Sequence, residues 1–167
     1  MKYAVDRFGT EIPIFLSGVS MGAATVLMAS ELELPDNVAG IIADCPYSSP
    51  EAIIRKVAKD MGLPPTVMFP FVRLGARIFG RCDIVSASAV SAVANTKIPI
   101  LLIHGDDDRF VPYEMSSEIF AACVGTKRFE SFHLAGHALS YMVDTEKYAQ
   151  VFSEFMEECL ERERLDL

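Results

Sequence analysis

The stretch Ile12-Pro13-Ile14-Phe15-Leu16-Ser17-Gly18-Val19-Ser20-Met21-Gly22 decides the fold of this chain. A short apolar run leads into Gly18, and a second apolar run, residues 23–29, follows Gly22. The first run predicts a buried strand over residues 12–17, and the second predicts a helix packed on most of its circumference. A GxSxG motif between a strand and a helix is typical of a serine held at the tip of a tight turn, so Ser20 is a candidate nucleophile. The alternative is an ordinary Gly-Ser turn.

The small residues around Ser20 have a steric explanation. Gly18 and Gly22 are predicted to remove side chains that would collide at so tight a turn. Ala23 and Ala24 allow the helix to lie near the sheet, with its N-terminal amides directed at the place where negative charge develops during acyl transfer. The backbone N–H of Met21 is therefore a candidate oxyanion donor.

Length and composition restrict the class of protein. The 167 residues fit one domain, residues 1–167, that is long enough to bury a core. The formal net charge of −8, with no basic stripe to offset it, excludes a nucleic-acid partner from our expectations. No apolar tract is long enough to span a membrane and no signal-peptide pattern follows Met1, so we expect a cytoplasmic protein without a membrane partner.

The 4 cysteines are far apart and show neither CxxC nor Cys/His metal spacing. They are predicted to be reduced thiols that act as small hydrophobic core residues. The sequence therefore predicts no metal site.

Strand and helix patterns alternate along the chain. Residues 2–8 resemble helical turns that Gly9 stops, and the strand that ends at Asp44 is followed by a helix. Further helices are predicted over residues 50–60, 86–94 and 113–124 and along residues 151–160, and further strands over residues 38–43, 98–104 and 127–132. This alternation predicts an α/β fold, a three-layer αβα sandwich with a mostly parallel sheet whose functional groups lie at the carboxyl ends of the strands.

The segment from Met61 to Gly80 differs from the rest because it is rich in Met, Phe and Pro. It is either a lid or acyl-pocket wall, which would make residues 50–80 a cap, or a crossover helix that covers the sheet. Arg73 and Arg77 are four residues apart on one face of the predicted helix. A solvated face explains this pair better than an anion site does.

A nucleophilic serine needs a base, and the chain contains 3 histidines. His104 ends a predicted buried strand, where a structural, hydrogen-bonded role is expected. His133 closes the last strand and its direction stays open. His137 lies in a loop of small residues, which can carry an imidazole to Ser20, so we favour His137 as the base.

The base needs an acid that orients it. Asp106, Asp107 and Asp108 share one loop, and Asp108 is distinguished by the segment that ends in Pro112, which opens the next helix. Asp44 is the alternative, although it also fits a turn-forming acid that bonds local amides. We favour Asp108, because the order Ser, Asp, His supports it.

Three motifs together give a resemblance: GVSMG at residues 18–22, HGDDDRFVP at residues 104–112 and AGH at residues 135–137. With them the chain resembles the α/β-hydrolase superfamily of serine esterases and peptidases. The resemblance implies that Ser20 is the nucleophile, Asp108 the acid and His137 the base. It also implies that the Met21 amide is half of the oxyanion hole and that no cofactor is needed.

The resemblance covers only the C-terminal part of that fold, from the strand that carries the nucleophile onward. Members of the superfamily have several earlier strands and an early loop that supplies the second oxyanion donor, and this sequence has no counterpart of either. We therefore expect an open sheet edge near residues 12–16 that pairs in a homo-oligomer or with a separate N-terminal piece. We also expect turnover to be lowered by about 100- to 1,000-fold.

The leading hypothesis is a serine hydrolase that acts on a small-molecule ester, thioester or amide through an acyl-enzyme at Ser20. The alternative is a weakened or inactive α/β-hydrolase fragment that acts as a binding scaffold or needs a partner to complete its oxyanion hole. Acyl transfer to an acceptor other than water is a third hypothesis.

Overall fold

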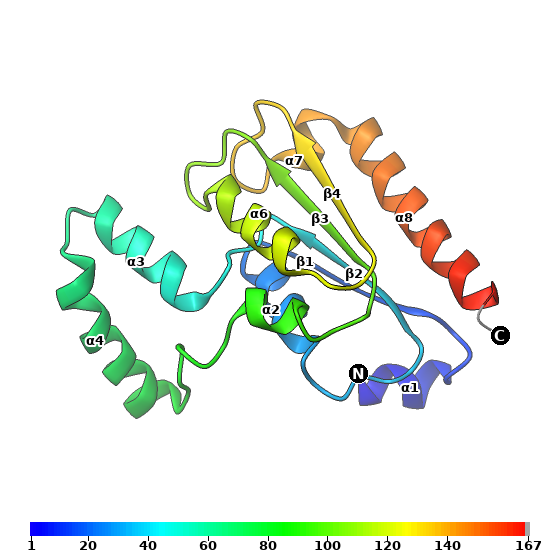
Figure 1. The fold of residues 1–167 in the computed structure, drawn as a ribbon, viewed down its shortest axis with the longest axis horizontal. Helices are drawn as coiled ribbons and strands as arrows, with labels where there is room; N and C mark the ends of the chain where they lie inside the picture. The colour runs from blue at the N-terminus through cyan, green and yellow to red at the C-terminus, as the bar shows by residue number, and fades with distance from the viewer. Residues whose placement is uncertain (166–167) are drawn as a thin grey trace.

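Four parallel strands form the sheet in a computed structural model of the chain, which describes residues 1–165 (Figure 1). The strand order is β1-β2-β3-β4, and every neighbouring pair is parallel. The strands are β1 Ile14–Val19, β2 Val38–Asp44, β3 Ile100–Gly105 and β4 Lys127–Phe132. Because the strands are parallel, their carboxyl ends lie along one edge of the sheet, and the loops that follow them meet there.

Three helices cover one face of this sheet: α2 Met21–Ala29, α5 Ala89–Val93 and α6 Tyr113–Ala122. Side chains alternate between the faces of a strand, so Ile41 of β2 and Leu102 of β3 point to the same layer. They pack against Leu27 of α2 and Ile119 of α6, and all four side chains have no exposed area. The apolar pattern of residues 23–29 is explained by this contact.

The other face of the sheet is covered by the long helix α8 Thr145–Leu165, which the short helix α7 Ser140–Val143 precedes. Ile42 and Leu101, which alternate with the residues of the first face, pack against Val151 and Phe155 of α8. Helix, sheet and helix therefore form three layers, which confirms the predicted αβα sandwich. No helix within residues 1–165 combines the length and apolarity needed to cross a membrane.

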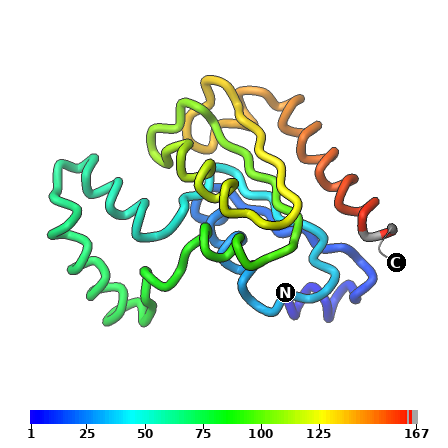
Figure 2. The backbone as a smooth tube through the Cα atoms, in the orientation of Figure 1, coloured from blue at the N-terminus to red at the C-terminus, as the bar shows by residue number. Residues whose placement is uncertain are grey.

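Strand β1 lies at an edge of the sheet, and its residues are half-buried or exposed. The prediction of a buried strand over residues 12–17 is wrong on this point, because within residues 1–165 β1 pairs only with β2. Ile12 and Val19 are 51% and 49% exposed. Figure 2 traces the chain into this strand from helix α1 Lys2–Phe8. As expected, α1 ends at Gly9, which has a φ of 85°.

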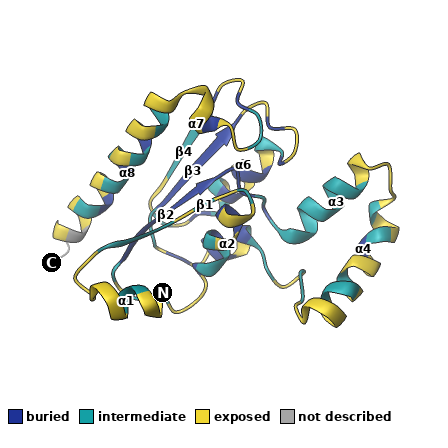
Figure 3. Cartoon of the chain, turned by 180° about the vertical axis from the view of Figure 1, so that it is seen from behind, coloured by how far each residue is buried: buried dark blue, intermediate teal, exposed yellow. Residues whose placement is uncertain are grey.

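A helical arm formed by α3 Pro50–Asp60, α4 Pro65–Gly75 and the π-helix η1 Ala76–Gly80 stands away from the sheet (Figures 1 and 3). Helix α3 begins at Ser49, whose hydroxyl accepts the N–H of Ala52 at 3.1 Å, with Pro50 in its first turn. Helix α4 packs on α3, so the segment from Met61 to Gly80 does not cover the sheet and that alternative is wrong. The short helix α5 covers the sheet instead.

Candidate active site

Ser20 occupies the turn between β1 and α2 with a φ of 54° and a ψ of −113°. Few residues adopt this backbone conformation, which costs about 1–3 kcal/mol and persists only when its surroundings impose it. Two backbone hydrogen bonds do so: Ser20 N–H donates to the carbonyl of Asp44 at 2.7 Å, and Ala24 N–H donates to the carbonyl of Ser20 at 3.0 Å. The turn therefore presents the Ser20 hydroxyl at the carboxyl edge of the sheet.

The two glycines of the motif differ in their surroundings. A Cβ atom on Gly18 would lie 2.3 Å from the carbonyl carbon of Gly22, which is closer than real Cβ atoms approach. A Cβ atom on Gly22 would have no atom of the described structure within 4 Å. The steric explanation predicted for both glycines is thus correct for Gly18 and wrong for Gly22, because the space beside Gly22 is open.

His137 lies in the loop after β4, between Ser20 and Asp108. Its Nε2 is 2.9 Å from Oγ of Ser20, and its Nδ1 is 2.7 Å from Oδ2 of Asp108. With Asp108 ionised, Nδ1 carries the proton and its N–H donates a hydrogen bond to the carboxylate, so Nε2 is free to accept a hydrogen bond from the hydroxyl of Ser20. The structure thus brings together the three side chains that the sequence predicted as nucleophile, base and acid.

Asp108 is held ionised and in one orientation. Its Oδ1 accepts the backbone N–H groups of Phe110 and Val111, each at 2.9 Å. Burial alone would raise the pKa of Asp108, but hydrogen bonds from His104, His137 and Val111 outweigh it and lower the pKa to about 2. At neutral pH the carboxylate can therefore stabilise a positive charge on His137.

His104 has the buried, hydrogen-bonded position that the sequence predicts for it, with no exposed area. Its Nδ1 accepts the hydroxyl of Ser116 at 2.6 Å, and its Nε2–H donates to the carbonyl of Val111 at 3.0 Å. The same Nε2 lies 3.3 Å from Oδ2 of Asp108. His104 therefore contacts the carboxylate of Asp108 from its buried position, and its hydrogen bond with Ser116 connects β3 to α6.

His133, whose direction the sequence left open, pairs with a different acid. Its Nδ1 lies 2.7 Å from Oδ2 of Asp106, and its side chain is 81% exposed. The hydrogen bond from His133 holds the pKa of Asp106 below its usual range. His133 and Asp106 thus form a separate pair, and the imidazole that contacts Ser20 is that of His137.

Asp44, the alternative acid, is 3% exposed and is not hydrogen-bonded to His137, whose ring nitrogens pair with Asp108 and Ser20. The Tyr148 hydroxyl donates to its Oδ2 at 3.2 Å, while its Oδ1 has no hydrogen-bond partner among residues 1–165. Burial raises the pKa of Asp44 above its usual range. Of the two candidate acids, the structure brings only Asp108 within hydrogen-bond distance of the imidazole.

Met21 is the first residue of α2, directly after Ser20. The first N–H groups of a helix have no acceptor within the helix, so the Met21 amide is available to an oxygen bound beside Ser20. The Met21 side chain is 70% exposed. The predicted oxyanion donor is thus the first backbone N–H of α2, on an exposed residue next to Ser20.

Comparison with known proteins gives the fold. No protein-family model matches the chain. The esterase Pf2001 from Pyrococcus furiosus superposes with a TM-score of 0.70 at 20% identity and covers 94% of this chain. The α/β-hydrolase MGS-MChE2, from a sediment metagenome of the Mar Chica lagoon, superposes with a TM-score of 0.64 at 18% identity and also covers 94% of it. The chain has the α/β-hydrolase fold.

This chain spans only part of the proteins that it resembles. It matches 58% of the Pyrococcus esterase and 66% of the metagenomic hydrolase. The uncharacterized protein YqkD from Bacillus subtilis (strain 168) is 25% identical over 145 residues, which are 86% of this chain and 48% of that protein. The chain thus spans about half the length of YqkD.

Cys45 is a neighbour of this site that the sequence analysis missed. It follows β2 directly, is 1% exposed and has a φ of 46°. Its Sγ, a ring nitrogen of His137 and a carboxylate oxygen of Asp108 all lie within 4.8 Å of one another. Burial, followed by the charge of Asp44, raises the pKa of Cys45 to about 12. No local spacing indicates this group, because its members come from three different strand ends.

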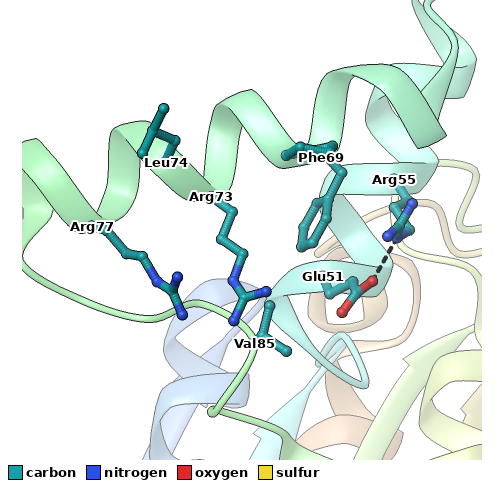
Figure 4. Close-up of a pocket in the computed structure, with 8 residues that line it drawn as sticks. Glu51, Arg55, Phe69, Arg73, Leu74, Arg77 and Val85 are labelled. Atoms are coloured by element: carbon teal, nitrogen blue, oxygen red, sulfur yellow. Dashed lines mark hydrogen bonds and ion pairs between the residues drawn. The ribbon is translucent and has the colours of Figure 1, made fainter.

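A cavity of about 490 Å³ lies at the helical arm of this chain (Figure 4). Three guanidinium groups line it, from Arg55, Arg73 and Arg77, and Figure 4 shows them together with Glu51. Arg55 Nε donates to Glu51 at 2.7 Å. The carboxylate of Glu51 thus compensates part of the positive charge of these guanidinium groups.

The predicted solvated face of Arg73 and Arg77 is an ion-pair cluster in the structure. Arg73 donates two hydrogen bonds to Asp83, at 3.2 and 3.1 Å, and Arg77 donates a third. These bonds hold the pKa of Asp83 well below its usual range, and the hydrogen bonding from Arg73 has the largest effect. The side chains of Arg73 and Arg77 keep 37% and 51% exposure, so they are solvated and paired at once.

Proposed function

We propose that this chain is a serine hydrolase that cleaves an ester, thioester or small amide through an acyl-enzyme on Ser20. The observation that carries the proposal is the continuous hydrogen-bonded line from Ser20 through His137 to Asp108. A serine hydroxyl is a weak nucleophile at neutral pH, and an adjacent base held in the correct tautomer by a carboxylate is what activates it. The esterase and hydrolase names of the structural neighbours support the same reaction class.

In the proposed first step, Oγ of Ser20 attacks the carbonyl carbon of the substrate while Nε2 of His137 takes the hydroxyl proton. Asp108 stabilises the imidazolium that forms. The backbone N–H of Met21 donates to the oxyanion. The bond from the carbonyl carbon to the leaving group then breaks, and His137 gives its proton to that group.

In the second step water attacks the acyl group on Ser20. His137 takes a proton from the water, and the bond between the carbonyl carbon and Oγ breaks. Ser20 regains its proton from His137, and a carboxylic acid leaves. Protons and electrons balance without a redox partner, so the proposal needs only an acyl substrate and water.

We assign the arm, residues 50–80, as a cap beside this site. Lys56 of α3 donates to the carbonyl of Arg109 and lies 5.7 Å from the centre of the Phe110 ring. The Phe110 ring in turn lies 5.0 Å from the ring of His137. These contacts connect helix α3 of the arm, through Phe110, to His137, the proposed general base.

A second candidate function is a binding scaffold whose site needs another segment before it reacts. The open space beside Gly22 and the exposure of Met21 favour it, because both leave room next to Ser20, and within residues 1–165 β1 has only β2 as a neighbouring strand. In this case the hydrogen-bonded line is present but turnover is weak, since one missing oxyanion donor costs about 100- to 1,000-fold.

A fluorophosphonate probe separates these functions, because only an activated serine reacts with it. We expect intact-mass spectrometry to find one probe per chain, and peptide mapping to place it on Ser20. A Ser17→Ala variant is the matched control and should label normally, whereas Ser20→Ala should not. A folded chain that takes no probe and does not hydrolyse p-nitrophenyl acetate would leave only the scaffold function.

A further inference from the structure

Cys45 brings a thiol into a site whose proposed chemistry does not use one. The residue is 1% exposed and adopts a φ of 46°, a conformation that only a minority of residues other than glycine adopt. Its Sγ lies within 4.8 Å of the His137 nitrogen and of the Asp108 oxygen. A sulfur, an imidazole nitrogen and a carboxylate oxygen are the three ligand types that Zn²⁺ combines in proteins.

A second buried acidic side chain lies beside this group. Asp44, the residue before Cys45, is buried with an Oδ1 that has no hydrogen-bond partner in the described part of the chain. The charged groups that act on Asp44 are His104 and His137. The carboxyl groups of Asp44 and Asp108 thus share a buried neighbourhood with the imidazoles of His104 and His137, and carboxylate charge there stabilises a cation.

We propose that Cys45, His137 and Asp108 form a binding site for a thiophilic divalent cation such as Zn²⁺. A tetrahedral Zn²⁺ with bonds of about 2.0–2.3 Å needs ligand atoms roughly 3.3–3.8 Å apart. The present separations, none above 4.8 Å, exceed this spacing by at most about 1.5 Å, so small side-chain movements bring the three ligand atoms to an ion. His137 is the least buried of the three and gives the ion its path from solvent.

Binding of this cation opposes hydrolysis. Cys45 releases its thiol proton to solvent as the Zn–S bond forms, and the lone pair of His137 goes to the metal. Ser20 then has no group to accept its proton. Inhibition rests on the proposed function, whereas cation binding does not, so the two can be tested separately.

Titration with Co²⁺ tests the site without measuring activity. Cobalt takes the same ligands as zinc, and a cobalt–thiolate bond absorbs in the near ultraviolet while tetrahedral cobalt absorbs in the visible. We expect both absorptions to saturate at one Co²⁺ per chain and to disappear when Zn²⁺ is added. A wild-type chain that shows no thiolate band with excess Co²⁺ would overturn the proposal.

Variants assign the site to these residues. Cys45→Ala should lose the thiolate band and weaken Zn²⁺ binding by more than the about 10- to 100-fold that loss of a supporting contact causes. Cys45→Ser, which keeps the side-chain volume and is a poor zinc ligand, gives the same test if Cys45→Ala does not fold. Cys82→Ala is the matched control, because Cys82 is an exposed thiol outside the group.

Two further variants separate the alternatives. Ser20→Ala should keep the cobalt spectrum although it removes the proposed nucleophile, so a failure of the proposed function leaves this test intact. His133→Ala removes the exposed imidazole that pairs with Asp106, and it is the control for adventitious binding at the surface. A band that survives Cys45→Ala, or that disappears in Cys82→Ala or His133→Ala, would place the cation elsewhere and contradict the proposal.

Discussion

Nε2 of His137 lies 2.9 Å from Oγ of Ser20, although 117 positions of sequence separate the two residues. The two residues meet because the loops after β1 and β4 both lie at the carboxyl edge of one parallel sheet. The distance is that of a hydrogen bond, so proton transfer from the hydroxyl to the imidazole needs no rearrangement of the chain.

Ser20→Ala should reduce ester hydrolysis to the background rate, which for other serine hydrolases is a loss of about 10⁶-fold in turnover. The reason is that, among residues 1–165, Ser20 has the one hydroxyl that hydrogen-bonds to His137. The measurement is p-nitrophenyl acetate hydrolysis, with Ser17→Ala as the control. Activity retained in Ser20→Ala would move the nucleophile to another residue.

Asp108→Asn should lower turnover by about 10⁴-fold, because an amide cannot hold the imidazole tautomer that a carboxylate holds. Asp44→Asn should change turnover little. Its amide oxygen can still accept the Tyr148 hydroxyl that now donates to Oδ2. Steady-state kinetics on both variants decide between the acids, and the reverse pattern would make Asp44 the orienting acid.

The sequence predicted the fold class and the place of the three site residues because both follow from local patterns. Strand, turn and helix periodicity placed Ser20, Asp108 and His137 at strand ends, and parallel pairing then brings those ends together. Their hydrogen bonds agree with the prediction, and their catalytic roles remain a proposal.

Other features depend on contacts that no local pattern records. Cys45 looked like a small core residue, and only the meeting of three strand ends places its sulfur near His137. The apolar residues of α4 fit a helix on the sheet as well as a helix on α3, so periodicity could not choose between them. Gly22 completes the motif, but within residues 1–165 nothing lies within 4 Å of a Cβ position on it, and its sequence context does not reveal this open space.

The two glycines of the motif should respond oppositely to alanine. In Gly18→Ala the new Cβ would lie 2.3 Å from the Gly22 carbonyl carbon, and the backbone shift should cost about 2–4 kcal/mol. Gly22→Ala adds a better helix former to α2 where space is open and should gain about 0.5–1 kcal/mol. Urea unfolding of the two variants measures both effects, and equal destabilisation would show that the flank of Gly22 is closed in solution.

The open edge of β1 should make the chain self-associate, as predicted for residues 12–16. The N–H groups of Ile14 and Ser20 bond to the β2 side, so by the period of a strand the N–H of Ser17 points outward. Ser17→Pro removes an outward donor and should convert an oligomer to a monomer, whereas Ser17→Ala should not. Light scattering measures this, and a wild-type chain that is already a monodisperse monomer would argue against self-association.

Asp83 should control how firmly the arm holds its second helix. Its carboxylate joins Arg73 of α4 to Arg77 of η1, so Asp83→Asn should raise amide exchange in α4 and η1 by a few fold at pH 7. The pKa of Asp83 is lower in the folded chain than its usual value of 3.8, so the wild-type contribution is complete above that pH and is lost as the pH falls below it. Asp36→Asn, in the loop before β2, is the control and should leave exchange in the arm unchanged. Exchange that is equally slow in Asp83→Asn and wild type would mean that packing against α3, rather than this ion-pair cluster, positions the helix.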